Sequence, residues 1–84
     1  MEIKILGRDC ADCHLLVERT IKALSQLNIE GNVEKVEDPE DVWAYGLLQP
    51  PAIVIDGHVV SQGKLYTITE LRELILQQQH IVLD

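Results

Sequence analysis

Two cysteines, Cys10 and Cys13, are the residues of this sequence best suited to chemistry, and two residues separate them. Thiols at this spacing can form a reversible disulfide, and the corresponding thiolates can also bind a soft metal ion. We expect Cys10 to be the exposed nucleophile at the start of a helix, and Cys13 to be the resolving thiol within the first helical turn. Cys10 would attack a disulfide, and Cys13 would then release the mixed disulfide.

Charged residues flank the cysteine pair and affect the pKa of the Cys10 thiol. The free amide groups and the dipole at a helix start favour a thiolate, and Arg8 would add to that effect. Asp9 and Asp12 oppose it, because a neighbouring carboxylate disfavours a second negative charge. We therefore interpret Arg8, Asp9 and Asp12 as modulators of the thiol pKa, and the residues alone leave the sign of the net shift open.

Three other uses of the cysteine pair are open. The pair followed by His14 is also an attachment motif for haem, with His58 or His80 as a further ligand, but no export signal precedes it and the only methionine is Met1. Two thiolates could instead carry a soft metal ion, although the expected order of elements differs from the usual copper-carrier order. In the third alternative both cysteines are inert, buried apolar residues. The position of the pair at a helix start argues against this alternative. Metal binding or transfer is the main rival function.

Composition limits the kind of protein and its partners. The 84 residues suffice for one domain, over residues 1–84, and 46% of them are hydrophobic, as in globular proteins. The net charge of −7 argues against nucleic acid and anionic membranes as partners. No apolar stretch approaches the roughly 20 residues that span a bilayer, and no leader is visible. We expect a cytoplasmic monomer.

Periodicity and turn signals predict the first half of the fold. Residues 2–6 alternate apolar and charged side chains, which predicts a strand. Residues 11–28 carry one apolar stripe at helical spacing, and residues 32–36 form a second strand. Asp38 followed by Pro39 predicts a short helix that stops near Gly46, with Trp43 packed on it.

The second half contains a hairpin and a last helix. Pro50-Pro51 excludes a helix and introduces an apolar strand over residues 52–55. Asp56-Gly57 predicts a tight turn into a return strand over residues 58–60. Thr67 and Glu70 have the spacing of a capping box, after which the last helix begins. The order βαβαββα predicts an α/β fold with a four-stranded mixed sheet flanked by three helices, its first two strands parallel and its hairpin antiparallel.

At this point the chain resembles a known group, the thioredoxin-like superfamily. The resemblance rests on the strand–Cys-x-x-Cys–helix opening, on the segment Pro51-Ala52-Ile53-Val54-Ile55-Asp56-Gly57 and on the final helix. The stretch from Ala44 to Gly63 is similar in particular to small prokaryotic redox-active disulfide proteins, the minimal thioredoxins or glutaredoxin-like proteins. The resemblance implies a thiol–disulfide oxidoreductase with no cofactor beyond its own cysteines. Its partners would be protein or small-molecule disulfides and a reductase.

The resemblance also implies roles for the two prolines. Pro51 would be a cis-proline lying against the cysteine pair, whereas the residues alone favour a trans proline that begins a strand. In this superfamily the residue before the cis-proline usually pairs its N–H and C=O with an extended substrate. That position is Pro50, which has no N–H, so Pro50 and Pro51 are expected to shape a substrate groove. Asp9 stands where a Trp is usual, and Ala11-Asp12 replaces the usual intervening pair, so partners and reduction potential stay open.

Overall fold

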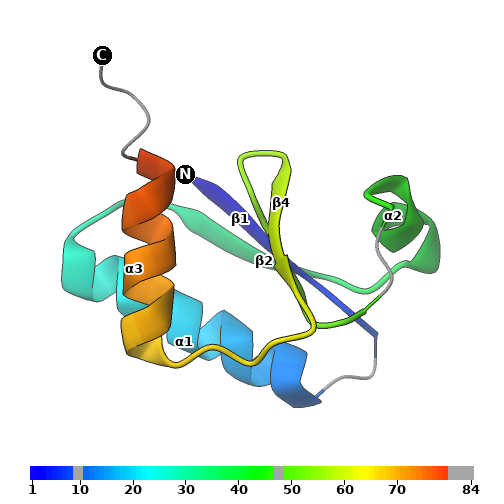
Figure 1. Ribbon diagram of the computed structural model, residues 1–84, viewed down its shortest axis with the longest axis horizontal. Coiled ribbons are helices and arrows are strands. Elements are labelled where there is room, and N and C mark those ends of the chain that lie inside the picture. Colours follow the sequence, from blue (N-terminus) through cyan, green and yellow to red (C-terminus); the bar gives the residue numbers. More distant parts are fainter. Residues whose placement is uncertain (9–10, 47–48, 80–84) are drawn as a thin grey trace.

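A computed structural model describes residues 1–8, 11–46 and 49–79 of the chain. Within them, strands and helices follow the predicted βαβαββα order (Figure 1). The elements are β1 (Glu2–Leu6), α1 (Ala11–Leu27), β2 (Asn32–Val36), α2 (Pro39–Ala44), β3 (Ala52–Ile55), β4 (His58–Gln62) and α3 (Ile68–Gln79).

The four strands form one mixed sheet, as the sequence predicts, and their order in it is β2-β1-β3-β4. β1 runs parallel to β2 and antiparallel to β3, and β3 pairs with β4 in an antiparallel hairpin. Leu6, the last residue of β1, lies opposite Val36 of β2 and opposite Ala52 of β3. The carboxyl end of β1 and the amino end of β3 therefore meet at one edge of the sheet.

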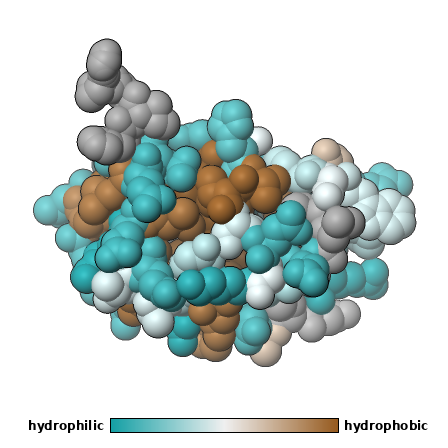
Figure 2. All heavy atoms as spheres, viewed as in Figure 1, coloured by the Kyte–Doolittle hydropathy of each residue, from teal (hydrophilic) through white to brown (hydrophobic). Residues whose placement is uncertain are grey.

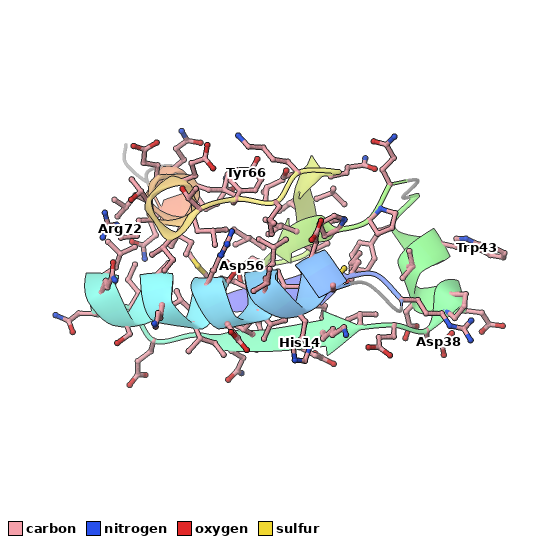
Figure 3. All side chains as sticks on the ribbon, turned by 90° about the horizontal axis from the view of Figure 1, so that it is seen from below. His14, Asp38, Trp43, Asp56, Tyr66 and Arg72 are labelled. Carbon is pink, nitrogen blue, oxygen red and sulfur yellow. The ribbon has the colours of Figure 1, made fainter. Side chains whose placement is uncertain are left out.

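Helices α1 and α3 lie side by side on one face of the sheet (Figures 1 and 3). Ile3 and Ile5 of β1 point to this face because successive side chains of a strand alternate between faces. The core they enter is almost wholly aliphatic. Its buried members are Ile3, Ile5, Cys13, Leu16, Ala23, Leu24, Ile53, Ile55, Leu71 and Ile75.

The short helix α2 packs on the opposite face, over the end of β1. There Leu6, Ala52 and Val54 are buried, and Val42 and Tyr45 of α2 pack against them. β3 is thus covered on both faces, which explains why its four residues form a continuous apolar run. Figure 2 shows the α1 and α3 side of the molecule, where apolar side chains gather between α3 and β4 with polar side chains around them.

Local signals set the bounds of α2. The N–H of Glu40 donates to Oδ1 of Asp38 at 3.0 Å, and Pro39 occupies the first turn, so the predicted cap is confirmed. Trp43 differs from the prediction, because its side chain is 72% exposed instead of packed. A helix of six residues packs only one stripe against the sheet, and the partly buried Val42, with Tyr45 just after the helix, already fills it.

The hairpin and the last helix begin as predicted, and β4 is longer than predicted. Asp56 and Gly57 both have positive φ, at 49° and 87°, which is the geometry of a tight hairpin turn. A register shift opposite Ile53 and Val54 lets β4 continue to Gln62, past the predicted end at residue 60. The apolar pattern of β4 ends before its pairing does, so the pattern alone underestimates the strand.

A reciprocal capping box starts α3. The N–H of Glu70 donates to Oγ1 of Thr67 at 3.1 Å, and the N–H of Thr67 donates to Oε1 of Glu70 at 3.0 Å. An N-cap threonine of this kind contributes about 1 kcal/mol to the free energy of unfolding. Nζ of Lys64 lies 3.1 Å from Oε2 of Glu70, so a cation also faces the carboxylate.

The capping box predicts a pH-dependent stability. The pKa of Glu70 lies below its usual value of 4.5. The main cause is the hydrogen bond from the N–H of Thr67, and the second is the hydrogen bond from Lys64. A lowered folded-state pKa adds stability above the unfolded-state pKa, and this stability is lost as the pH falls through the folded-state value. Urea unfolding at pH 7 should therefore show Glu70→Gln to be less stable than the wild type. This difference in the free energy of unfolding should close as the pH falls below 4.5.

Glu73→Gln, at an exposed position of the same helix, is the control. A gap that is constant from neutral to acidic pH would contradict this origin.

Candidate active site

Cys13 lies at the sheet edge where β1 ends and α1 begins. Its side chain is fully buried, at 0% exposure, and Sγ lies 3.8 Å from the carbonyl oxygen of Leu6. Because Leu6 pairs with Ala52, the residue after Pro51, the same edge also carries the second proline. Pro50 is 37 residues after Cys13 in the sequence. The strand register nevertheless brings Cys13 and the Pro50-Pro51 turn to one end of the sheet.

Of the other charged and cysteine residues around the motif, the structure describes Arg8 and Asp12. Cys10 and Asp9 lie outside the described residues, so their predicted roles stay predictions. α1 begins at Ala11, and its first-turn amide groups and dipole make this point favourable for an anion. Arg8 and Asp12 are exposed on either side of it. Exposed charges act through solvent, so any effect of theirs on a thiol pKa should weaken in salt.

The two prolines have different environments. The peptide bond that joins them is cis, Pro51 is buried and Pro50 is exposed. The carbonyl of Pro51 accepts a hydrogen bond from the N–H of Gly63 at 2.8 Å. The N–H of Gln49 donates to Oε1 of Gln62 at 3.4 Å, a long hydrogen bond. The end of β4 therefore holds the proline turn from both sides.

Gly63 fits this position for two reasons. Its φ is +75°, in the left-handed region that glycine adopts without strain. A Cβ atom there would also come within 2.8 Å of Oε1 of Gln49, so the end of that flexible side chain would have to move. Gln49, Gln62 and Gly63 were not identified as site residues from the sequence. Gln49 directly precedes Pro50 in sequence, whereas only the pairing of Ala52 with Gln62 brings Gln62 and Gly63 to the prolines, and no motif in the sequence signals that register.

A pocket of about 240 Å³ opens between α2 and the sheet edge. It joins Arg8 and Pro50, both expected at the site, with residues that the sequence reasoning did not assign to it. The lining residues are Leu6, Gly7, Arg8, Glu37, Pro39, Val42, Trp43, Gln49, Pro50 and Ala52. The sequence carries no signal of this pocket, because the exposure of Trp43 is known only from the structure.

Glu37 is the acidic member of the pocket, and cations surround it. Nζ of Lys35 lies 2.7 Å from Oε2 of Glu37. The hydrogen bond from Lys35 is the main reason that the pKa of Glu37 lies below its usual value. Arg8 and His14 lower it further by their charge. His14 is exposed and lies below α1 in Figure 3, and its charge acts on Glu37, so its side chain is not part of the core that contains Cys13.

Two further structural observations concern metals and membranes. Among the described residues, no three His, Cys, Asp or Glu side chains gather closely enough to hold a metal ion. Cys10 lies outside these residues, so this observation does not bear on the soft-metal alternative for the cysteine pair. In residues 1–8, 11–46 and 49–79, no helix combines the length and the apolar character needed to cross a bilayer.

Comparison with known proteins gives consistent matches. Residues 1–76 match the family model of the thioredoxin domain. A thioredoxin of Methanothermobacter thermautotrophicus is 27% identical over 75 residues, which cover 89% of this chain and 97% of that protein. A thioredoxin of Methanocaldococcus jannaschii is 30% identical over 71 residues, 84% of this chain and 81% of the other. The solved structure of thioredoxin 1 from Thermosipho africanus shares the fold, with a TM-score of 0.66 at 16% identity over 96% of this chain and 97% of that one.

Burial predicts that Cys13 reacts slowly. In a Cys10→Ser variant, alkylation of Cys13 by iodoacetamide should be at least about tenfold slower in the folded protein than in urea, because the sulfur must first be uncovered by local opening. The matched control has both native cysteines replaced by serine and carries Ala11→Cys, an exposed thiol in the same helical turn. Its alkylation should be nearly independent of urea. Equal folded and unfolded rates for Cys13, followed by mass spectrometry, would be incompatible with the described burial.

Proposed function

The chain belongs to the thioredoxin domain family, and on that premise we propose that it is a thiol–disulfide oxidoreductase in which Cys10 is the nucleophile and Cys13 the resolving residue. The observation that carries the proposal is the position of Cys13. Its sulfur is buried in the first turn of α1, directly behind the helix start and at the same sheet edge as Pro51. A sulfur so placed is shielded from substrate, as the proposed resolving role requires.

The proposed reaction has two exchange steps. The Cys10 thiolate attacks one sulfur of a substrate disulfide, which forms a mixed disulfide and releases one substrate thiolate. The Cys13 thiolate then attacks Sγ of Cys10, forms the Cys10–Cys13 disulfide and releases the second substrate thiolate, and both thiolates take up protons. The substrate gains two electrons and the protein loses two. A reductase or small dithiol must supply them again.

The surroundings of the pair support this chemistry. The first-turn amide groups of α1 stabilise an anion at the helix start, and the exposed Arg8 adds positive charge. Asp9 and Asp12 oppose the thiolate and thereby lower its population at neutral pH. The protein acts without a cofactor other than its own cysteines, as a cytoplasmic monomer that exchanges with protein or small-molecule disulfides.

Serine variants test the two assigned roles. Cys13→Ser should accumulate a covalent mixed disulfide with substrate, because the step that resolves it is lost. Cys10→Ser should form none, and both variants should lose turnover of an aromatic disulfide that releases a coloured thiol. Intact-mass measurement without reductant detects the adduct. Trapping on Cys10→Ser instead would reverse the roles, and a stoichiometric soft metal in the purified wild type together with no turnover would favour the metal-transfer alternative.

The lack of an N–H at Pro50 predicts weak recognition of extended substrates. A substrate carbonyl placed opposite Pro50 loses a hydrogen-bond donor, and an unpaired buried carbonyl costs about 1–3 kcal/mol, or about one to two decades of affinity. Pro50→Thr restores the donor and should lower the KM for a disulfide-linked peptide by that factor. Pro50→Ala restores the same N–H without a hydroxyl and should match it. If neither variant changes KM while circular dichroism shows an intact fold, the groove is not used in this way.

A further inference from the structure

Glu37 lies where β2 ends, at the edge of the sheet. In the strand register Lys35 pairs with Ile5, whose side chain enters the core under α1, so Lys35 lies on the same face of the sheet. Oε2 of Glu37 lies 2.7 Å from Nζ of Lys35, and the Lys35 side chain is only 25% exposed. A cation that is partly packed in this way keeps the carboxylate of Glu37 at the sheet edge, on the side of α1.

The start of α1 lies beside this carboxylate. Arg8, which precedes α1, lines the 240 Å³ pocket together with Glu37. His14, in the first turn of α1, lies below the helix in Figure 3, and its charge acts on Glu37. Glu37 therefore has residues from before and from after the helix start in its neighbourhood.

Glu37 differs in position from the other acidic side chains of this region. It is the only carboxylate among the described residues that line the 240 Å³ pocket. Asp38 and Asp41 line a different hollow, which Lys4 also lines, and Asp38 caps α2. Asp12 is exposed on α1. Glu37 is thus the acidic group that shares a site with the cation preceding α1.

Opposing charges act on the start of α1. The positive charges of Arg8 and His14 favour a thiolate there, as the helix dipole does. The carboxylate of Glu37 opposes a thiolate, because a neighbouring negative charge disfavours a second one. Lys35 cancels part of the charge of Glu37, so these two residues act on a thiol in opposite directions.

We propose that Glu37 regulates the exchange site by offsetting the positive charge beside the start of α1, and that it thereby lowers the thiolate fraction of Cys10. Glu37 acts through its charge, so it is not a catalytic residue. The inference rests on the proposed oxidoreductase function, in which Cys10 is the nucleophile. A less stable thiolate favours the disulfide form, so Glu37 makes the cysteine pair more reducing at pH values at which Cys10 is ionised.

The pH profile of Cys10 alkylation tests this role without any exchange reaction. In a Cys13→Ser background Cys10 is the only thiol, and iodoacetamide reacts with its thiolate. Glu37→Gln should lower the pKa of Cys10 by about half a pH unit, which is a roughly threefold larger thiolate fraction at neutral pH. The effect should shrink in high salt, because Glu37 is exposed.

Matched variants separate this role from a general change in net charge. Glu34→Gln removes the same charge from the same strand, but Glu34 pairs with Lys4 and so lies on the opposite face of the sheet. This variant should leave the pH profile unchanged. Lys35→Gln should raise the pKa of Cys10, and the double variant Lys35→Gln with Glu37→Gln should return it to near the wild-type value.

The reduction potential of the protein with both cysteines is a second readout. At a pH above the measured pKa of Cys10, Glu37→Gln should shift the equilibrium about threefold toward the dithiol, which is about 14 mV for a two-electron couple. Well below that pKa the thiol is protonated in both proteins, so their potentials should be equal.

The outcomes distinguish this inference from the proposed function. An unchanged pKa of Cys10 in Glu37→Gln, or equal changes in Glu37→Gln and Glu34→Gln, would overturn the inference, provided that circular dichroism shows folded variants. The expected change of pKa, together with no turnover of an aromatic disulfide by the protein with both cysteines, would uphold the role of Glu37 and overturn the proposed function.

Discussion

Leu6 ends β1 opposite Val36 on one side and Ala52 on the other, and every part of the proposed site is attached to that point. α1 starts a few residues after it, and the sulfur of Cys13 lies against the carbonyl of Leu6. Pro51 directly precedes the residue with which Leu6 pairs. A shift of β1 by one residue would turn Ile3 and Ile5 away from the core, so hydrophobic burial fixes the register and, through it, the site.

Much of the fold could be predicted from the sequence because local and global signals agree. Alternation over β1, the apolar stripe of α1, the Asp56-Gly57 turn and the capping box at Thr67 each favour the structure that forms. The length of β4 could not be predicted, since its pairing continues beyond its apolar residues through a register shift. The exposure of Trp43 could not be predicted either, because a propensity says nothing about which residues of a six-residue helix face the sheet.

The candidate site was only partly predictable for a different reason. The burial of Cys13 follows from its place in the first turn of an amphipathic helix, and the residues alone suffice to expect it. The cis form of the Pro50-Pro51 bond was expected only from the resemblance, since the residues favour trans. Gln49, Gln62 and Gly63 support the proline turn through contacts across β3 and β4, which depend on tertiary register and leave no local pattern. Glu37 enters the pocket from the end of β2 for the same reason.

The central claim is that Cys10 and Cys13 act together as a two-electron dithiol. A redox titration in glutathione buffers of graded potential, with free thiols alkylated and counted by mass spectrometry, tests it most directly. The account predicts one reversible transition between a form with two free thiols and a monomeric form with none, described by a two-electron Nernst curve. Two thiols that stay free in every buffer, or oxidation that yields only glutathione adducts or linked dimers, would contradict it.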